Sequence, residues 1–194
     1  MARGANFVVA AVAGRGFCGI YKLSYNMAGM HKHLQRLDRI WIEFPIYFVT
    51  VCTFRRRPIL ARAAIAQILV DELRDARERH GWAIGSYVIM PDHVHFFCAA
   101  ERDAKTLSDL MREWKSWTSR RIRAVLPRPA TAATKTSADT SLWQREFFDH
   151  ILRSEESFQE KWNYVRNNPV RAGLAPSLDD WPYFGRIESL EQCP

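Results

Sequence analysis

The sequence predicts an α+β fold, a ferredoxin-like antiparallel sheet with helices on one face, whose elements follow the order β-α-β-β-α-β-α. Three observations predict it. Runs rich in β-branched and aromatic residues alternate with amphipathic segments. Two of those runs, 82–90 and 93–99, are separated by only a short turn, which indicates a hairpin. The last amphipathic segment carries a tyrosine and ends at a proline.

The first predicted strand begins after Pro45, and its residues are mainly β-branched and aromatic until a run of three arginines closes it. The segment 60–80 follows, with Ile65, Ile68, Leu69 and Leu73 at helical spacing. Gly81 stands where a helix commonly ends in a left-handed residue. We therefore expect an amphipathic helix between the first and second strands.

The hairpin and a second helix come next. Pro91 and Asp92 lie between the two strands and are favourable turn residues. Thr106 and Asp109 resemble a helix N-terminal cap, and apolar residues then keep helical spacing as far as about Arg123. The sequence predicts a second helix here.

The last part of the predicted domain holds a loop, a strand and a third helix. Residues 127–141 are mostly Ala, Thr, Ser and Pro without periodicity, which indicates a flexible insertion. Residues 142–152 have a mixed aromatic pattern that is compatible with a strand. Two acids at 155–156 open the third helix, and Pro169 ends it.

The composition indicates one globular domain of 39–185 within 194 residues, of which 47% are hydrophobic. Residues 1–38 are interpreted as an N-terminal extension or a misassigned start, and 186–194 as a C-terminal tail. The net charge of +7 favours a polyanionic partner such as nucleic acid. Four scattered cysteines and the lack of a signal sequence or long apolar stretch predict a cytoplasmic protein that does not span a membrane.

His93 and His95 are separated by one residue on a predicted strand, so their side chains project from the same face. Two adjacent imidazoles provide half of a metal site. The competing interpretation is a pair of solvated or core histidines, which such a pattern alone more often represents.

Tyr164 and Asn168 lie four residues apart on the third predicted helix, about 40° from each other around its axis. They point away from most of the apolar stripe formed by Phe158, Trp162 and Val165. Tyr164 is therefore a candidate for chemistry. The alternative is a surface tyrosine whose ring packs on a neighbouring residue.

The second predicted helix is basic and also contains Trp114 and Trp117. Basic groups can follow a phosphate backbone while an aromatic ring stacks on an unpaired base. Trp114 fits the apolar stripe, which leaves Trp117 as the candidate for stacking. The alternative is a solvated basic face without a ligand.

Four ordered blocks resemble one family, the single-tyrosine HUH transposases of the insertion-sequence-200-like superfamily, and within it the REP-associated tyrosine transposases. The blocks run from about residue 40 to 185. They are Tyr87-Val88-Ile89-Met90-Pro91-Asp92-His93-Val94-His95, Trp143-Gln144-Arg145-Glu146-Phe147-Phe148-Asp149-His150, Tyr164-Val165-Arg166-Asn167-Asn168-Pro169-Val170-Arg171-Ala172-Gly173-Leu174 and Trp181-Pro182-Tyr183.

The resemblance implies a divalent metal, Mg²⁺ or Mn²⁺, held by His93, His95 and Asn168, and a nucleophile at Tyr164. It implies attack on single-stranded DNA near imperfect palindromes, with a 5′-phosphotyrosine intermediate, by a monomer or a homodimer. The role of His150, in the second block, stays open. The residues that we expect to contact DNA are Arg112, Lys115, Trp117, Arg120, Arg121, Arg123, Arg145, His150 and Arg171.

The sequence departs from the family pattern in its N-terminal extension, its insertion at 127–141 and the ending Trp181-Pro182-Tyr183-Phe184-Gly185, which lacks small hydroxyl residues. Two other functions remain open. One is a domesticated module that binds hairpin DNA or RNA without cutting it. The other is a metal-dependent hydrolase that uses the histidine pair to activate water.

Overall fold

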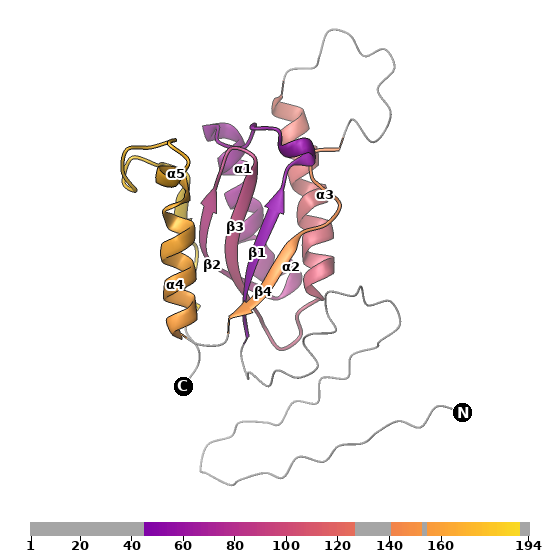
Figure 1. Ribbon diagram of the computed structural model, residues 1–194. Coiled ribbons are helices and arrows are strands. Elements are labelled where there is room, and N and C mark those ends of the chain that lie inside the picture. The colour runs from indigo at the N-terminus through magenta and orange to yellow at the C-terminus, as the bar shows by residue number, and fades with distance from the viewer. Residues whose placement is uncertain (1–44, 127–140, 153–154, 191–194) are drawn as a thin grey trace, which may run out of the picture. The chain divides into compact units, whose positions relative to one another are not determined.

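A computed structural model describes residues 45–126, 141–152 and 155–190 (Figure 1). These residues belong to one compact unit that spans 42–194. The predicted N-terminal extension, all but the last residue of the predicted insertion at 127–141, and the end of the predicted tail lie outside the described residues. None of the described helices is long and apolar enough to cross a membrane.

The centre of the fold is a five-stranded antiparallel sheet with the order β4-β1-β3-β2-β5. The predicted antiparallel α+β plan is confirmed. β1, β3 and β2 are each paired on both sides, and β3 lies at the centre of the sheet. The strands are β1 (Ile46–Cys52), β2 (Trp82–Ile89), β3 (His93–Ala100), β4 (Phe148–Leu152) and β5 (Phe184–Arg186).

The predicted helices are present, and short helical elements accompany them. The Thr106 hydroxyl accepts a hydrogen bond from the Asp109 amide at 3.1 Å and caps α3, as the sequence predicts. Gly81 has a φ of +73° and ends α2 in the left-handed conformation that glycine adopts without strain. The helices are the 3₁₀ turn η2 (Phe54–Arg56), α1 (Ala63–Arg74), α2 (Ala76–His80), α3 (Leu107–Val125), α4 (Glu155–Arg166) and α5 (Asn168–Arg171).

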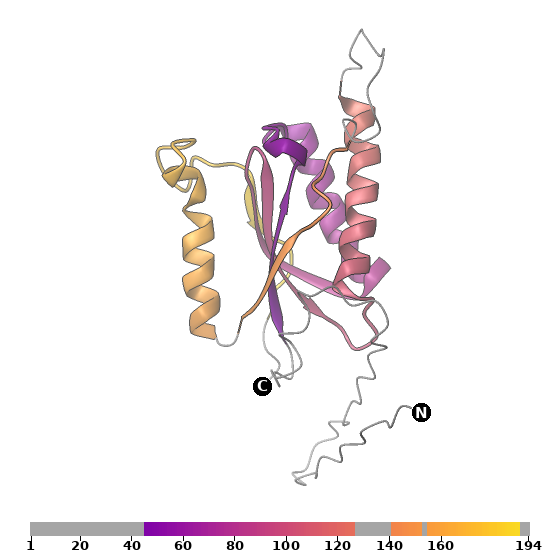
Figure 2. The same cartoon turned by 45° about the vertical axis from the view of Figure 1, so that its right-hand side comes forward.

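The helices cover both faces of the sheet, so the prediction of helices on one face is wrong. Figure 2 shows α1 and α3 on one side of the sheet and α4 on the other. On the α1 and α3 side, Val94 and Phe96 of β3 join the larger apolar core. The opposite face carries Phe97, whose ring centre lies 4.8 Å from that of Phe158 in α4. Because apolar residues occupy both faces of β3, both faces need a cover.

The sheet continues into residues that we had assigned to the C-terminal tail. β5 pairs with β2, and the amides of Ile187 and Glu188 donate to carbonyl oxygens of β2 at 3.2 and 3.0 Å. Trp181 is buried, and its indole N–H donates to the Ile89 carbonyl at 3.1 Å. The folded part of the chain therefore extends past residue 185.

Candidate active site

The two histidines of β3 lie on the face that α4 covers. In the antiparallel pairing with β1, His95 stands opposite Thr50 and His93 opposite Cys52. The two imidazole ring centres are 4.6 Å apart, with an angle of 83° between the ring planes. Phe48 stacks on the other side of His95 at 5.4 Å. The strand alternation that the sequence predicts thus brings both imidazoles into one site.

Hydrogen bonds fix the His95 ring. Its Nδ1 lies 2.8 Å from the Thr50 hydroxyl, and its Nε2 lies 3.1 Å from the amide nitrogen of Asn168. Because the amide donates to Nε2, the ring proton resides on Nδ1 and is donated to Thr50. Burial, together with the positive charges of neighbouring groups, lowers the pKa of His95 to about 3. The ring is therefore neutral at physiological pH, with a lone pair on Nε2.

The Asp92 carboxylate holds the His93 ring through Nδ1, as the Thr50 hydroxyl holds the His95 ring. Its Nδ1 lies 2.6 Å from Oδ1 of Asp92, and Oδ2 of Asp92 accepts from Arg56 at 3.3 Å. A carboxylate that holds one ring nitrogen of a histidine orients the other nitrogen toward a ligand. Nε2 of His93 is thus the nitrogen left for a ligand, whereas Nε2 of His95 accepts from the Asn168 amide.

These donors fit a divalent metal ion. Among the described residues, no three His, Cys, Asp or Glu side chains gather into a metal site. The ligand set predicted from the sequence is not of this kind, because its third member, Asn168, is an amide and not one of these four residue types. Asn168 contacts the lone pair of His95 directly, and a rotation of its amide would turn Oδ1 toward an ion at that position. Two imidazoles and an amide oxygen leave the remaining positions of an octahedral ion to water or substrate.

The nucleophile candidate lies on the neighbouring helix, which ends earlier than predicted. α4 stops at Arg166, and Asn168 begins the short helix α5 because Pro169 provides no N–H for a continuous helix. Tyr164 and Asn168 therefore belong to consecutive helices. The predicted apolar stripe of α4 is confirmed, since Val165 is buried and Phe158 and Trp162 pack on the core beneath it.

Tyr164 is 56% exposed and has a cationic neighbour. The guanidinium carbon of Arg171 lies 4.3 Å from the centre of its ring. A hydrogen bond from Arg171, together with its charge and that of Lys161, lowers the pKa of Tyr164. Lys161 also lowers the pKa of His95, so its charge acts on both halves of the site. The phenol is accessible and biased toward its reactive anionic form.

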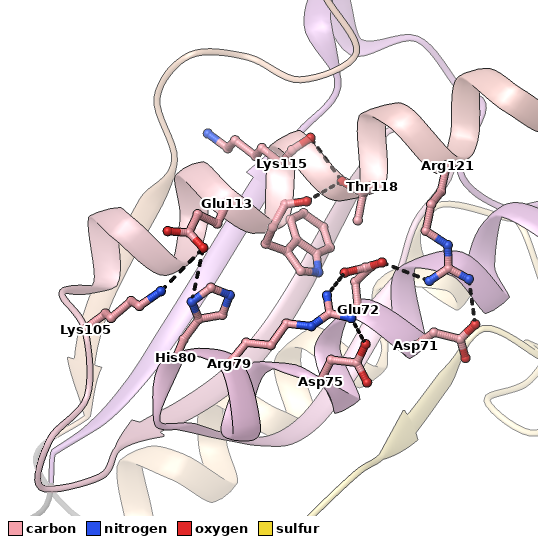
Figure 3. Close-up of polar contacts among 11 residues, drawn as sticks. Asp71, Glu72, Asp75, Arg79, His80, Lys105, Glu113, Lys115, Thr118 and Arg121 are labelled. Atoms are coloured by element: carbon pink, nitrogen blue, oxygen red, sulfur yellow. Dashed lines mark hydrogen bonds and ion pairs between the residues drawn. The ribbon is translucent and has the colours of Figure 1, made fainter.

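The predicted DNA contacts divide between the two faces of the sheet. Those on α3 lie across the sheet from the histidine pair (Figure 2). Arg121 hydrogen-bonds the carboxylates of Glu72 and Asp71 at 2.9 and 3.1 Å (Figure 3). Arg112 pairs with Asp109 at 2.9 Å. The positions of Arg120 and Arg123 on α3 put them in the same layer.

Two further residues of α3 have environments that the sequence did not indicate. Lys115 donates to the main-chain carbonyl oxygens of residues 144, 145 and 146 and therefore has an internal structural role. Trp117 is 42% exposed, and the guanidinium groups of Arg79 and Arg120 lie 5.6 and 4.5 Å from its ring centre. Trp114 is buried in the core, as predicted.

The remaining predicted contacts lie nearer the histidines. Arg171 contacts Tyr164, as described above. His150 stands opposite Phe48 on the edge strand β4, so its side chain projects from the same face as His95. Arg145 lies three residues before this strand, and 91% of its side chain is exposed.

The sequence reasoning missed three residues that shape the site. Asp92 was interpreted only as a turn residue, although its position next to His93 could have indicated a second role. Thr50 could not be identified because the β1 and β3 register is invisible in the sequence. Lys161 precedes Tyr164 by three residues, and helical spacing could have placed it on the same side.

Comparisons with known proteins identify a matching family and similar chains. The family model described as "Transposase IS200 like" matches residues 45–168, a range that includes His93, His95, Tyr164 and Asn168. A REP-associated tyrosine transposase of Escherichia coli K12 is 23% identical over 145 residues, which cover 75% of this chain and 78% of the relative. A putative REP-associated tyrosine transposase of Haemophilus influenzae is 25% identical over 134 residues, covering 64% and 74% of the two chains.

A solved structure shares the fold. It is that of a REP-associated tyrosine transposase bound to a REP hairpin, and it matches with a TM-score of 0.58 and 22% identity over 75% of this chain and 79% of the other. The matched residues of the family model span most of the described fold and both halves of the site. This chain therefore belongs to the IS200-like transposase family.

Proposed function

We propose that this protein is a metal-dependent single-stranded DNA transesterase that cuts and rejoins DNA near palindromic hairpins through a 5′-phosphotyrosine at Tyr164. The observation that carries the proposal is the contact between Asn168 and Nε2 of His95, 3.1 Å long. It joins the metal-binding face of β3 to the helices that carry an exposed tyrosine of lowered pKa.

The chemistry follows from the groups present. The Tyr164 oxygen attacks the scissile phosphorus, the bond from phosphorus to the 3′ oxygen breaks, and that oxygen leaves as a 3′-hydroxyl after taking up a proton. Arg171 favours the attacking phenolate because its positive charge lies beside the ring. A divalent ion held by His93, His95 and Asn168 would offset negative charge on the phosphate. The reverse attack by a 3′-hydroxyl rejoins DNA and releases the tyrosine.

The substrate is proposed from charge and from the relatives. The protein carries a net charge of +7, which favours a polyanion. Its relatives are described as REP-associated tyrosine transposases, and one solved relative is bound to a REP hairpin. We propose imperfect palindromes flanked by unpaired DNA as the substrate.

The test is the formation of a covalent protein–DNA adduct. End-labelled hairpin DNA with single-stranded flanks is incubated with the protein and Mn²⁺, and the products are separated under denaturing conditions. The wild type and the control Tyr183→Phe should form the adduct, whereas Tyr164→Phe should not. An unchanged adduct in Tyr164→Phe would contradict the proposal.

The same experiment separates the alternatives. A binding module would retain the hairpin in a salt-dependent complex without cleaving it in any metal. A hydrolase would release cut DNA with no protein attached, and its turnover would survive the loss of the Tyr164 hydroxyl.

A further inference from the structure

Phe148 is an exposed aromatic residue on the same face of the sheet as the metal-ligand candidates. Its side chain is 57% exposed. Phe148 stands directly opposite Thr50 on β1, and Thr50 in turn stands opposite His95 on β3. Directly opposed residues of antiparallel strands project to the same face. The hydrogen bond between His95 and Thr50 confirms that this is the face of the site.

Phe148, Thr50 and His95 form a row across three strands, and the spacing of the strands gives the distance from Phe148 to His95. Neighbouring strands lie about 4.8 Å apart, so the backbones of Phe148 and His95 are roughly 10 Å apart across β1. This is a short span for nucleic acid, since a single extended strand covers it within two or three nucleotides at about 3.4 Å or more each. A base that flanks a phosphate at the histidines can therefore reach Phe148.

A bulge at the beginning of the edge strand orients Phe148. Thr53 pairs with Trp143, and Thr50 pairs with Phe148. Two residues separate the threonines on β1, but four residues separate Trp143 from Phe148 on the facing segment. The additional residues bend the edge of the sheet. Bulges of this kind commonly redirect side chains next to functional sites.

Lys115 fixes this bulge from the other side of the sheet. Its ammonium donates to the carbonyl oxygens of Gln144, Arg145 and Glu146 at 3.0, 3.0 and 3.1 Å. It also lies 5.4 Å from the ring centre of Phe147, which packs against the core beneath α3. Because Phe147 faces that core, its neighbour Phe148 faces the site.

We propose that Phe148 is a base-stacking subsite, on which an unpaired base next to the scissile phosphate lies, with Lys115 as its positioning residue. The proposal rests on the proposed function and adds the residue that places the unpaired strand. Arg145 lies three residues before Phe148 in the chain, its side chain is 91% exposed, and its partner among the described residues is the Glu146 carboxylate at 3.9 Å. An exposed apolar ring close in sequence to an exposed arginine suits a ligand that has both a flat aromatic surface and negative charge.

Phe148 suits this role better than Trp117, the stacking residue that the sequence suggested. Trp117 lies on α3, across the sheet from the histidines, and two guanidinium groups already lie against its ring. The stacking surface is therefore expected on the edge strand.

The experiment measures binding without cleavage. All variants are made in the Tyr164→Phe protein and mixed with hairpin DNA in which single flanking thymines are replaced by 5-iodouracil, which crosslinks to stacked aromatic side chains on irradiation. The crosslinked peptide is identified by mass spectrometry, and affinity is measured by fluorescence anisotropy. We expect a crosslink at Phe148, and Phe148→Ala should weaken binding about 10-fold.

Other variants complete the design. Phe148→Trp should retain the affinity, and Lys115→Gln should lower the crosslink yield at Phe148 while the protein keeps its folded circular dichroism spectrum. Val125→Ala is the matched control, since Val125 is an exposed apolar residue at the end of α3. Its affinity should equal that of the parent protein.

Three results would overturn the proposal. They are an unchanged affinity in Phe148→Ala, a crosslink and affinity loss that follow Trp117→Ala instead, and a change of molecular mass in solution on Phe148→Ala, which would assign the surface to a second copy of the chain. The adduct assay on the wild type is independent of these measurements. A failed adduct with an intact Phe148 crosslink refutes the catalytic proposal alone, and the converse refutes the subsite alone.

Discussion

The Asn168 amide lies 3.1 Å from Nε2 of His95 and joins two residues that are 73 positions apart in the chain. The contact occupies the lone pair that a metal ion would use. An ion bound there would require Asn168 to exchange its donating N–H for its accepting oxygen, while the hydrogen bond that His95 Nδ1 donates to Thr50 would keep the ring in place.

Replacement of Asn168 should change the affinity for Mn²⁺. Asn168→Ala removes one proposed ligand and should weaken binding about 10- to 100-fold in calorimetric titrations. Asn168→Asp provides a carboxylate, a preferred ligand of hard cations, and should retain or strengthen binding. Asn167→Ala is the control, because the Asn167 side chain donates to the Asn163 carbonyl instead. Equal affinities for all three proteins would exclude Asn168 as a ligand.

Arg171→Gln should shift the pH dependence of adduct formation to higher pH. Arg171 lowers the pKa of Tyr164, so its removal raises that pKa and leaves less phenolate at neutral pH. The rate should fall near pH 7 and recover as the pH approaches 10. Single-turnover rates between pH 6.5 and 10 test this expectation. Arg74→Gln removes the same charge on α1 and should keep the original profile, and a uniform loss at all pH values would indicate a different role for Arg171.

Glu72→Gln should destabilise the helical layer of α1 to α3. The Glu72 carboxylate is buried and accepts from Arg79 and Arg121 at 2.8 and 2.9 Å (Figure 3). Both arginines keep partial contact with solvent. The expected loss of unfolding free energy is therefore about 2 kcal/mol, less than the loss on breaking a fully buried ion pair. Urea unfolding measures this difference. The exposed Glu78→Gln should change stability by less than about 0.5 kcal/mol.

His80 should make the protein less stable in mild acid. Burial lowers the pKa of His80, and its Nδ1 lacks a hydrogen-bond partner, with Glu113 3.6 Å away. The unfolded chain therefore binds a proton more readily below pH 6.5, and the His80 contribution to stability is present above that pH and is lost as the pH falls. The drop in unfolding free energy between pH 7.5 and 5.5 should be smaller in His80→Gln. A drop of equal size in both proteins would show that His80 does not titrate on unfolding.

Candidate site residues could be proposed from the sequence where their relation depends only on nearby positions in the chain. The alternation of His93 and His95 needs only one strand, and the spacing of Tyr164 and Asn168 needs only one or two helical turns. Pro169 divides the predicted helix, yet Asn167 still donates to Asn163 and carries the helical path onward. The contact of Asn168 with His95 is thus compatible with the predicted helical spacing despite the break.

The predictions failed where they depended on contacts between segments that are far apart in the chain. The apolar stripe of α4 shows that the helix packs on a sheet, but no local pattern states which face it covers. Lys115 has the composition of a DNA-binding residue, and its actual partners lie about 30 positions away in the chain. Phe148 was overlooked because the bulge interrupts the regular alternation of residues 142–152.

The side chains of β3 alternate between the two faces of the sheet, and this alternation also separates two effects of substitution along a single strand. Val94, Phe96 and Cys98 face the core beneath α1 and α3, whereas His93, His95 and Phe97 face the α4 side. The effects of a saturation scan of residues 93–96 should therefore alternate with a period of two, whereas Phe97, which is buried against α4, should tolerate substitution as poorly as the even positions. Substitutions at even positions should reduce the amount of folded protein, and those at 93 and 95 should spare it while they abolish activity.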